Sequence, residues 1–189
     1  SVHAAREREP CPHSDRCGGC DWPHVETGPG ARLKALAAAD AARGQPVLSA
    51  LVAEARIHES PLAYRLRARL HWDPDARQLG FFEVRSRRVS EIHHCRVLSP
   101  DLMAALPSLT ETLAGRCPRP VDVEWLQGSG PGNAVAGLRQ AKGGPSRIDR
   151  RWLPRRDEID PRVNGFHILD RAGRTLEGWG SQTVHFDLP

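Results

Sequence analysis

Three cysteines within ten residues are the part of this sequence where chemistry is most evident. Cys11, Cys17 and Cys20 stand in the segment CPHSDRCGGC, and the other two of the five cysteines are Cys95 and Cys117. Zinc sites commonly take their thiolates from two separate C-x2-C pairs. Three neighbouring cysteines and a distant fourth are instead typical of an iron–sulfur cluster. The spacing therefore predicts a cluster loop that needs one further ligand from elsewhere in the chain.

The fourth ligand is Cys95 or Cys117. Cys95 ends the segment RVSEIHHC, which the pattern predicts as a strand, and a strand end can be held rigidly against a loop. Cys117 lies in a turn after a predicted helix, so we expect Cys95. Gly18 and Gly19 let the backbone of the loop come close to a cluster. If the metal is zinc, four histidines near the cysteines in the sequence are the rival ligands: His13, His24, His93 and His94.

The composition is that of a folded, basic protein. Hydrophobic residues make up 39% and charged residues 26% of 189 residues, and the formal net charge is +4. Of the 27 basic residues only Lys34 and Lys142 are lysines, which leaves 25 arginines (27 − 2). No apolar run is long enough for a membrane span, and the first residues do not form the apolar core of a signal peptide. We therefore expect a cytoplasmic protein whose cysteines are thiolates and not disulfides.

The elements that must position these cysteines are predicted to be two or three helices and a mostly antiparallel sheet. The alanine-rich segment from Ala31 to Arg43 predicts a helix, and residues 47–57 fit a helix or a strand equally well. Three strands follow as a meander: residues 64–72, 79–84 and 88–95.

A second half of helix and hairpins is expected after the meander. Ser99 and Pro100 are typical of a helix start, and Pro107 should kink or split that helix. Two hairpins follow, one from residues 121–126 and 134–139 and the other from 165–170 and 175–179, and residues 183–189 are a candidate further strand. The predicted fold class is α+β, with a meander, hairpins and an N-terminal metal-cluster loop.

The first strand of the meander carries a row of basic side chains. Arg65, Arg67 and Arg69 alternate with apolar residues, so that they share one face of the sheet. Residues two apart in a strand are separated by about 6.6 Å, which is close to a phosphate-to-phosphate step. His71 and Arg85 could extend this row. The row predicts binding of a nucleic-acid backbone, and the alternative is an ordinary solvated face.

The segments CPHSDRCGGC, SPLAYRLRARLHW, LGFFEVRSRRVSEI and HHCRVLSP resemble, in this order, a known family. They are similar to the iron–sulfur and RNA-binding region of the RNA (uracil-5-)-methyltransferases, in the cluster-containing rRNA branch. The resemblance runs from Cys11 to Pro100. It implies a 4Fe-4S cluster on four cysteines: Cys11, Cys17, Cys20 and Cys95.

The resemblance also implies an RNA partner, rRNA or tRNA, and a division of the chain. Residues 1–24 are expected to be the cluster loop, 25–115 a helix plus a basic meander closed by Cys95, and 116–189 hairpins that lead to a methyltransferase domain. The implied RNA-binding residues are Tyr64, Arg65, Arg67, Arg69, His71 and Arg85. We expect no catalytic residue here, because the S-adenosylmethionine loop and the catalytic cysteine of the family are not recognisable in this chain. A monomer is the expected oligomeric state. The glycine-rich stretch VEWLQGSGPGN is expected to be a hairpin turn, since a strand-like segment and not a helix follows it.

Two other classes remain as alternatives. One is a zinc-stabilised nucleic-acid-binding module, and the other is an electron carrier of the ferredoxin type. Carriers of that type are typically acidic, whereas this chain is basic.

Overall fold

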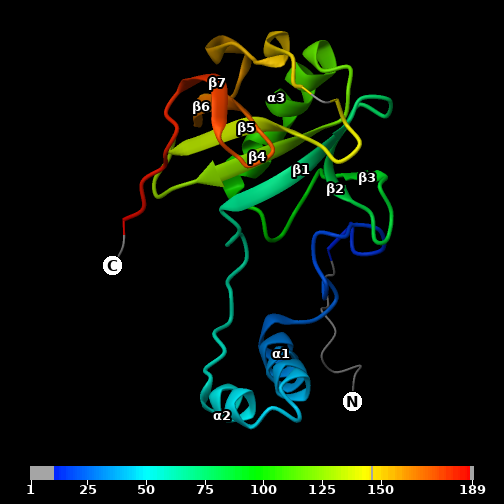
Figure 1. Cartoon of the computed structure of the whole chain (residues 1–189), viewed down its shortest axis with the longest axis vertical. Helices are drawn as coiled ribbons and strands as arrows, with labels where there is room; N and C mark the ends of the chain where they lie inside the picture. The colour runs from blue at the N-terminus through cyan, green and yellow to red at the C-terminus, as the bar shows by residue number, and fades with distance from the viewer. Residues whose placement is uncertain (1–10, 146, 188–189) are drawn as a thin grey trace.

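Seven strands form one sheet in the order β3-β2-β1-β4-β5-β6-β7 (Figure 1). The computed structural model describes residues 11–145 and 147–187. Every neighbouring pair is antiparallel except β5 and β6, so the predicted α+β class is correct for these residues. The strands are β1 Arg67–Asp73, β2 Gln78–Phe82, β3 Val89–Glu91, β4 Val121–Gln127, β5 Ala134–Gln140, β6 Val163–Leu169 and β7 Thr175–Gly180.

Both predicted hairpins are present, as β4–β5 and β6–β7. The glycine-rich stretch forms the turn of the first one, as expected. The sequence did not predict that β5 and β6 would pair in parallel and so join the hairpins into one sheet. The connection between them is long enough for this crossover and contains two short 3-10 helices, η2 Arg150–Trp152 and η3 Arg156–Glu158.

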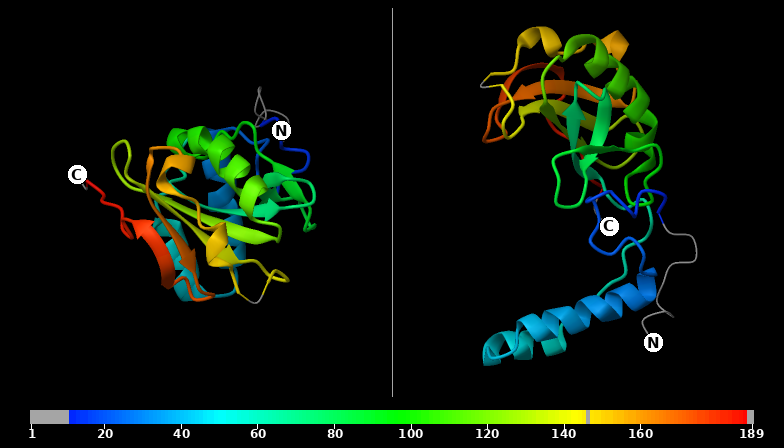
Figure 2. Two further views of the ribbon diagram at one scale, coloured as in Figure 1. Left: turned by 90° about the horizontal axis from the view of Figure 1, so that it is seen from above. Right: turned by 90° about the vertical axis from the view of Figure 1, so that its right-hand side faces the viewer.

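Helix α3, Pro100–Arg116, lies across one face of the sheet (Figure 2). Ser99 caps it as predicted, because its hydroxyl accepts a hydrogen bond from the Leu102 amide. Pro107 does not split the helix, which was one of the two predicted effects, since α3 runs through it. Pro107 lies on the exposed side of the helix. The opposite side packs on the sheet and holds the turns before and after Pro107 in place. Its buried residues are Leu102, Ala105, Leu106, Leu109 and Leu113.

The other two helices stand apart from the sheet. Helix α1 spans Thr27–Ala41, and α2, Pro46–Glu54, resolves the ambiguity of residues 47–57 in favour of a helix. Figures 1 and 2 show this pair joined to the body by the cysteine loop and by the extended segment that leads to β1. None of the α2 residues is buried among the described residues.

Several boundaries differ from expectation. The third strand is only three residues long and ends at Glu91, so Cys95 lies in a loop and not at a strand end. Tyr64 and Arg65 precede β1 and are not part of it. Residues 181–187 contain no strand, and residues 188–189 are outside the described part. Within that part, no helix has both the length and the apolar character that a membrane span requires.

The core and the predicted divisions can be placed on this fold. Trp72 and Trp125 lie in the core and are 2% and 1% exposed. Residues 1–10 of the expected 1–24 loop lie outside the described residues. The expected boundary at residue 115 falls at the end of α3, and the sheet takes strands from both sides of it.

Candidate metal centre

Four cysteines border one small apolar cavity at the edge of the sheet. Cys11, Cys17 and Cys20 reach it from the N-terminal loop, and Cys95 reaches it from the loop after β3. The structure thus brings together the four members of the predicted ligand set. Cys117 is elsewhere: it is 3% exposed in the core, and its thiol donates to the Arg119 carbonyl at 3.2 Å.

The end of β2 holds the cysteine loop in place. The Gly18 amide donates to the Phe82 carbonyl at 2.9 Å, and the Val84 amide donates to the Arg16 carbonyl at 2.9 Å. A Cβ atom on Gly18 would lie 2.8 Å from the Phe82 carbonyl oxygen, so this close approach needs glycine. Gly18 therefore allows the loop to pack closely on β2. The spacing of the cysteines did not indicate this contact.

A short backbone ladder, and not a strand end, fixes the position of Cys95. The Ala63 amide donates to the Arg96 carbonyl at 2.8 Å, and the Arg65 amide donates to the Val97 carbonyl at 2.7 Å. The Ser99 amide returns a bond to the Arg65 carbonyl at 3.1 Å. These bonds lie directly after Cys95 in the chain. They hold the segment that carries Cys95 against the segment before β1.

The electrostatic surroundings of the thiols are mixed. Burial raises the pKa of Cys17 and of Cys20, and the Arg65 guanidinium opposes this rise at both thiols. Arg65 also donates to the Gly19 carbonyl at 3.1 Å and lies over the Phe81 ring, so it is fixed beside the cavity. A positive group here favours the thiolate form that a metal requires.

The sulfur atoms surround the cavity and do not converge on one point. Among residues 11–145 and 147–187, no three His, Cys, Asp or Glu side chains are grouped closely enough to hold a single metal ion. A single zinc ion binds each thiolate at about 2.3 Å. A cluster instead binds each thiolate at an iron of its own.

Two members of the predicted basic row are paired with acidic residues. Arg69 donates to the Glu124 carboxylate at 2.8 Å, and the His71 imidazole lies 2.8 Å from the Asp122 carboxylate. His71 also stacks on Phe82, with ring centroids 3.6 Å apart. Two of the predicted basic groups therefore already have an acidic partner within the sheet. The signal was available in VDVEWL, whose alternation places Asp122 and Glu124 on the same face as the arginines.

The other predicted RNA-binding residues lie in three different places. Tyr64, which is 46% exposed, and Arg65 line a groove of about 600 Å3 between the cysteine loop and α1. Arg67 is exposed on the open face of the sheet, and its side chain has no ion pair or hydrogen bond among the described residues. Arg85 is exposed in the turn between β2 and β3.

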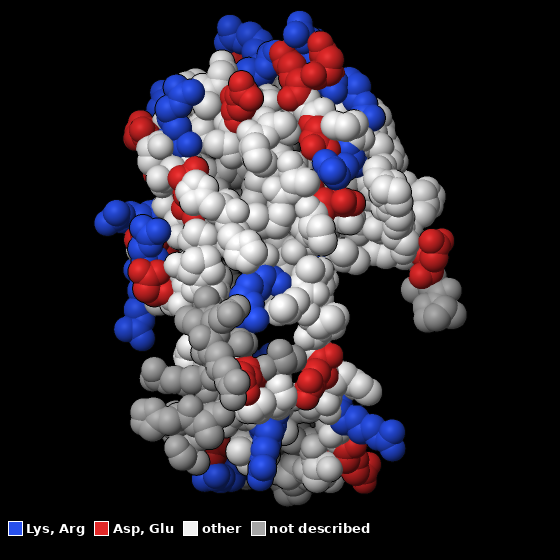
Figure 3. Space-filling model, turned by 180° about the vertical axis from the view of Figure 1, so that it is seen from behind, with Lys and Arg blue, Asp and Glu red and all other residues white. Residues whose placement is uncertain are grey.

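The groove combines aromatic and charged side chains. Trp22, which is 38% exposed, lies at its border, and both signs of charge are present. The basic side chains at the groove are Lys34, Arg65 and Arg96, and the acidic ones are Asp21, Glu26 and Glu59. Figure 3 shows the face opposite to that of Figure 1, where acidic and basic groups are likewise interspersed.

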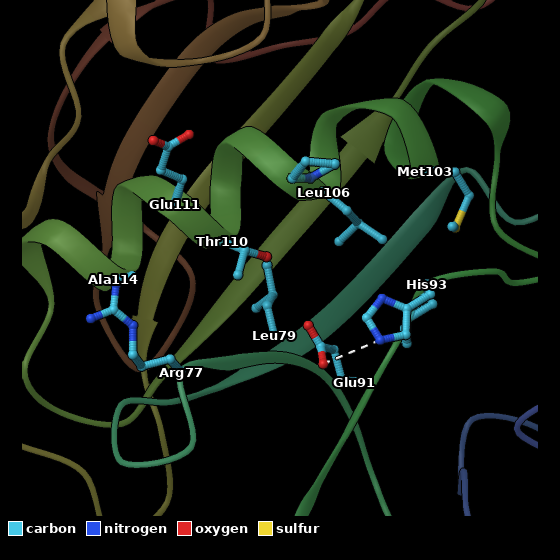
Figure 4. A pocket seen from close by; sticks show the side chains of 11 residues that line it. Arg77, Leu79, Glu91, His93, Met103, Leu106, Thr110, Glu111 and Ala114 are labelled. Carbon is cyan, nitrogen blue, oxygen red and sulfur yellow. Dashed lines mark ion pairs between the residues drawn. The ribbon is translucent and has the colours of Figure 1, made fainter.

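A second hollow, of about 460 Å3, lies between α3 and the β2–β3 strands (Figure 4). Its floor is apolar, with Leu79, Met103 and Leu106, and Arg77 and Glu111 stand at its border. None of the cysteines borders it. The four thiols therefore border the cysteine cavity and not this hollow.

Comparison with known proteins gives relatives for part of this chain. It is 36% identical over 112 residues to the 23S rRNA (uracil(1939)-C(5))-methyltransferase RlmD of Salmonella typhimurium. That match covers 58% of this chain and 24% of the relative. It is 34% identical over 124 residues to the protein of the same name from Vibrio cholerae, covering 62% of this chain and 25% of the relative. The chain thus spans about a quarter of the length of these curated relatives. No protein-family model matches it.

A solved structure shares the fold. The tRNA (uracil-54, C5)-methyltransferase of Pyrococcus abyssi, in complex with S-adenosyl-L-homocysteine, matches with a TM-score of 0.60 and 15% identity. The match covers 91% of this chain and 43% of that one. The arrangement of strands and helices described above is therefore also found within a longer protein.

Proposed function

We propose that this chain is the iron–sulfur and RNA-binding region of an enzyme that methylates uracil at C5 in RNA. In this proposal residues 1–24 form the cluster loop, residues 25–115 a helix plus the basic meander closed by Cys95, and residues 116–189 the hairpins that lead to a methyltransferase domain. Methyl transfer from S-adenosylmethionine belongs to that further domain, and this chain supplies no catalytic residue. The similarity to proteins named as 23S rRNA methyltransferases supports the choice of rRNA as the partner.

The observation that carries the proposal is the gathering of four thiols at one cavity. Three come from a single loop and the fourth from a segment 75 positions later (95 − 20), yet all four border the same apolar space. The residues present fit a 4Fe-4S cluster, because four thiols border the cavity and much of the lining between them is apolar, with Pro23, Phe81 and Ile92. Cys11, Cys17, Cys20 and Cys95 would hold it, and when bound it would supply iron–thiolate bonds between the loop and the sheet.

The role of this site is to fix groups that meet RNA. Cys95 is followed directly by the ladder that holds Ala63 and Arg65, so tying Cys95 to the N-terminal loop also fixes Tyr64 and Arg65 at the groove. Exposed aromatic rings such as Tyr64 are suited to stack on unpaired bases. The arginines supply charge-assisted bonds to phosphate.

Metal and sulfide analysis of protein purified without oxygen tests the proposal. The wild type should contain about four irons and four sulfides per chain, Cys95→Ser should lose them, and Cys117→Ser should keep them. Cys117→Ser is the matched control, because a serine hydroxyl can still donate to the Arg119 carbonyl. One zinc per chain and no iron would overturn the cluster and leave a zinc-stabilised module. A reversible redox centre with no affinity for rRNA would instead indicate an electron carrier.

A further inference from the structure

A buried histidine at the cysteine cavity lacks a hydrogen-bond partner. His13 stands in the loop between Cys11 and Cys17, is 8% exposed, and lines the same cavity as the four thiols. Its Nε2 atom is buried and has no hydrogen bond to any described residue. Burying such a group without a partner is unfavourable, so a partner is expected when the site is complete.

A backbone turn holds the residue that carries this ring. The His13 carbonyl accepts hydrogen bonds from the Arg16 amide at 3.2 Å and from the Cys17 amide at 2.8 Å, which closes a tight turn. The turn therefore fixes the backbone from which the His13 side chain enters the cavity, two residues from Cys11 and four from Cys17.

The chemistry of the cavity limits what the partner can be. The ring of His93 is tilted at a centroid distance of 6.4 Å, and neither Ser14 nor His94 bonds to the Nε2 atom, although both border the cavity. Much of the remaining lining is apolar, with Pro23, Phe81 and Ile92, and the other polarisable acceptors are sulfur atoms.

We propose that His13 donates a hydrogen bond from Nε2 to a sulfur atom of the cluster and so acts as a positioning residue that sets its reduction potential. The inference rests on the proposed function, because it needs the cluster. Donation to sulfur stabilises the additional negative charge that the cluster gains on one-electron reduction. The reduced form is then favoured, and the reduction potential is higher than it would be without the donor.

The test compares the reduction potentials of three variants with that of the wild type in protein purified without oxygen. His13→Met fills the space without a donor, and His13→Gln keeps an amide donor near the position of Nε2. His94→Met is the control, because His94 borders the cavity but is exposed, so water can satisfy it. Iron content is measured first, and the proteins are then titrated with dithionite and followed by electron paramagnetic resonance.

The expected result is a shift to lower potential in His13→Met, a smaller shift in His13→Gln, and the wild-type value in His94→Met. A His13→Met protein with full iron content and the wild-type potential would overturn the inference. Wild-type protein without iron would overturn the proposed function itself, and the inference with it.

A measurement on the wild type covers the case in which His13→Met does not hold iron. Protein with 15N-labelled histidine is reduced, and pulsed resonance spectra are compared in H2O and D2O. We expect one histidine nitrogen and one exchangeable proton to couple to the cluster, and this signal to survive in His94→Met. The Gly19 amide, 3.3 Å from the Cys17 sulfur, gives an exchangeable proton as well, but no histidine nitrogen accompanies it. No coupling to any histidine nitrogen would refute the hydrogen bond.

Discussion

Arg67 and Arg69 are two residues apart on one strand, yet their surroundings differ. The Arg69 side chain donates to Glu124, which also accepts from Arg139 at 2.6 Å. Arg67 is exposed and has no partner among the described residues. Of the two, Arg67 is therefore the one available to a phosphate, and Arg69 mainly balances a carboxylate.

Replacing each of these arginines by glutamine should separate RNA binding from stability. Arg67→Gln should weaken binding to rRNA fragments and reduce the salt slope of log K by about 1, because one phosphate contact is lost. Arg69→Gln should lower the free energy of unfolding by about 1 kcal/mol or less and change RNA affinity little. Filter binding at several salt concentrations and urea denaturation measure the two effects.

The reverse pattern would contradict this assignment. If Arg69→Gln cost most of the RNA affinity, the pair with Glu124 would have to open on binding. Arg174→Gln is a control for loss of one positive charge, since Arg174 pairs with Asp170 in the distant β6–β7 turn.

Among the elements, strands β1, β4 and β5 are tied together by one carboxylate. Burial opposes the ionisation of Glu124, but the hydrogen bond from Arg139 and the charges of both arginines outweigh it, and the pKa of Glu124 is lowered overall. A carboxyl group whose pKa is lowered by folding stabilises the native state above its ordinary pKa. That stabilisation is lost as the pH falls through the folded value.

Glu124→Gln should therefore destabilise the protein at neutral pH and much less in acid. We expect a loss of about 1–2 kcal/mol at pH 7, because two arginines lose a charged partner. The difference from wild type should shrink as the pH falls below about 4.5. Urea denaturation across this range measures it, and Glu111→Gln is the control, since Glu111 is exposed on α3 without an ion pair among the described residues. A difference that does not depend on pH would show that the charge of Glu124 is not what matters.

Helix α3 depends on the side chain that begins it. Ser99 is 1% exposed, accepts from the Leu102 amide and donates to the Gln127 side chain at 2.5 Å, which links the helix to the end of β4. Ser99→Ala removes a cap and leaves a buried amide oxygen of Gln127 with one donor fewer. We expect a loss of about 1–3 kcal/mol in the free energy of unfolding, measured by urea denaturation.

Thr110→Ala is the matched control for this hydroxyl. Thr110 lies in the same helix and makes no hydrogen bond with its side chain among the described residues, so its removal should stay within about 0.5 kcal/mol of wild type. Equal losses in the two variants would mean that the cap and the link to Gln127 contribute nothing specific.

On the scale of the whole molecule, the cysteine loop connects the sheet to the α1–α2 pair. Backbone bonds to the end of β2 and a bond from Arg65 hold the loop. If a cluster ties its cysteines to Cys95, removal of iron should free the loop. The bond after Arg16, an exposed residue, should then become open to trypsin.

Limited proteolysis with and without iron measures this coupling. We expect cleavage after Arg16 to become at least about tenfold faster when iron is removed, because local opening then costs less free energy. Cleavage after Arg56, an exposed residue of the extended segment after α2, should not change and is the internal control. Equal rates at Arg16 in both forms would show that the metal does not hold the loop.

The sequence by itself determined the features that depend on neighbouring residues. The hairpins followed from alternating strands around turns that contain glycine, and the start of α3 followed from Ser99 and Pro100. The cysteine spacing likewise indicated which thiols belong together, because three of them share one short loop.

Only the tertiary structure decided how distant segments meet. Cys95 is placed by bonds between residues 63–65 and 96–99, and the basic row is interrupted by acids that β4 brings alongside β1. The parallel pairing of β5 with β6 and the unbroken α3 also depend on packing, which outweighs the local preference of Pro107. Such pairings depend on which segments, distant in the sequence, bury their surfaces against each other. A local sequence pattern does not specify these segments.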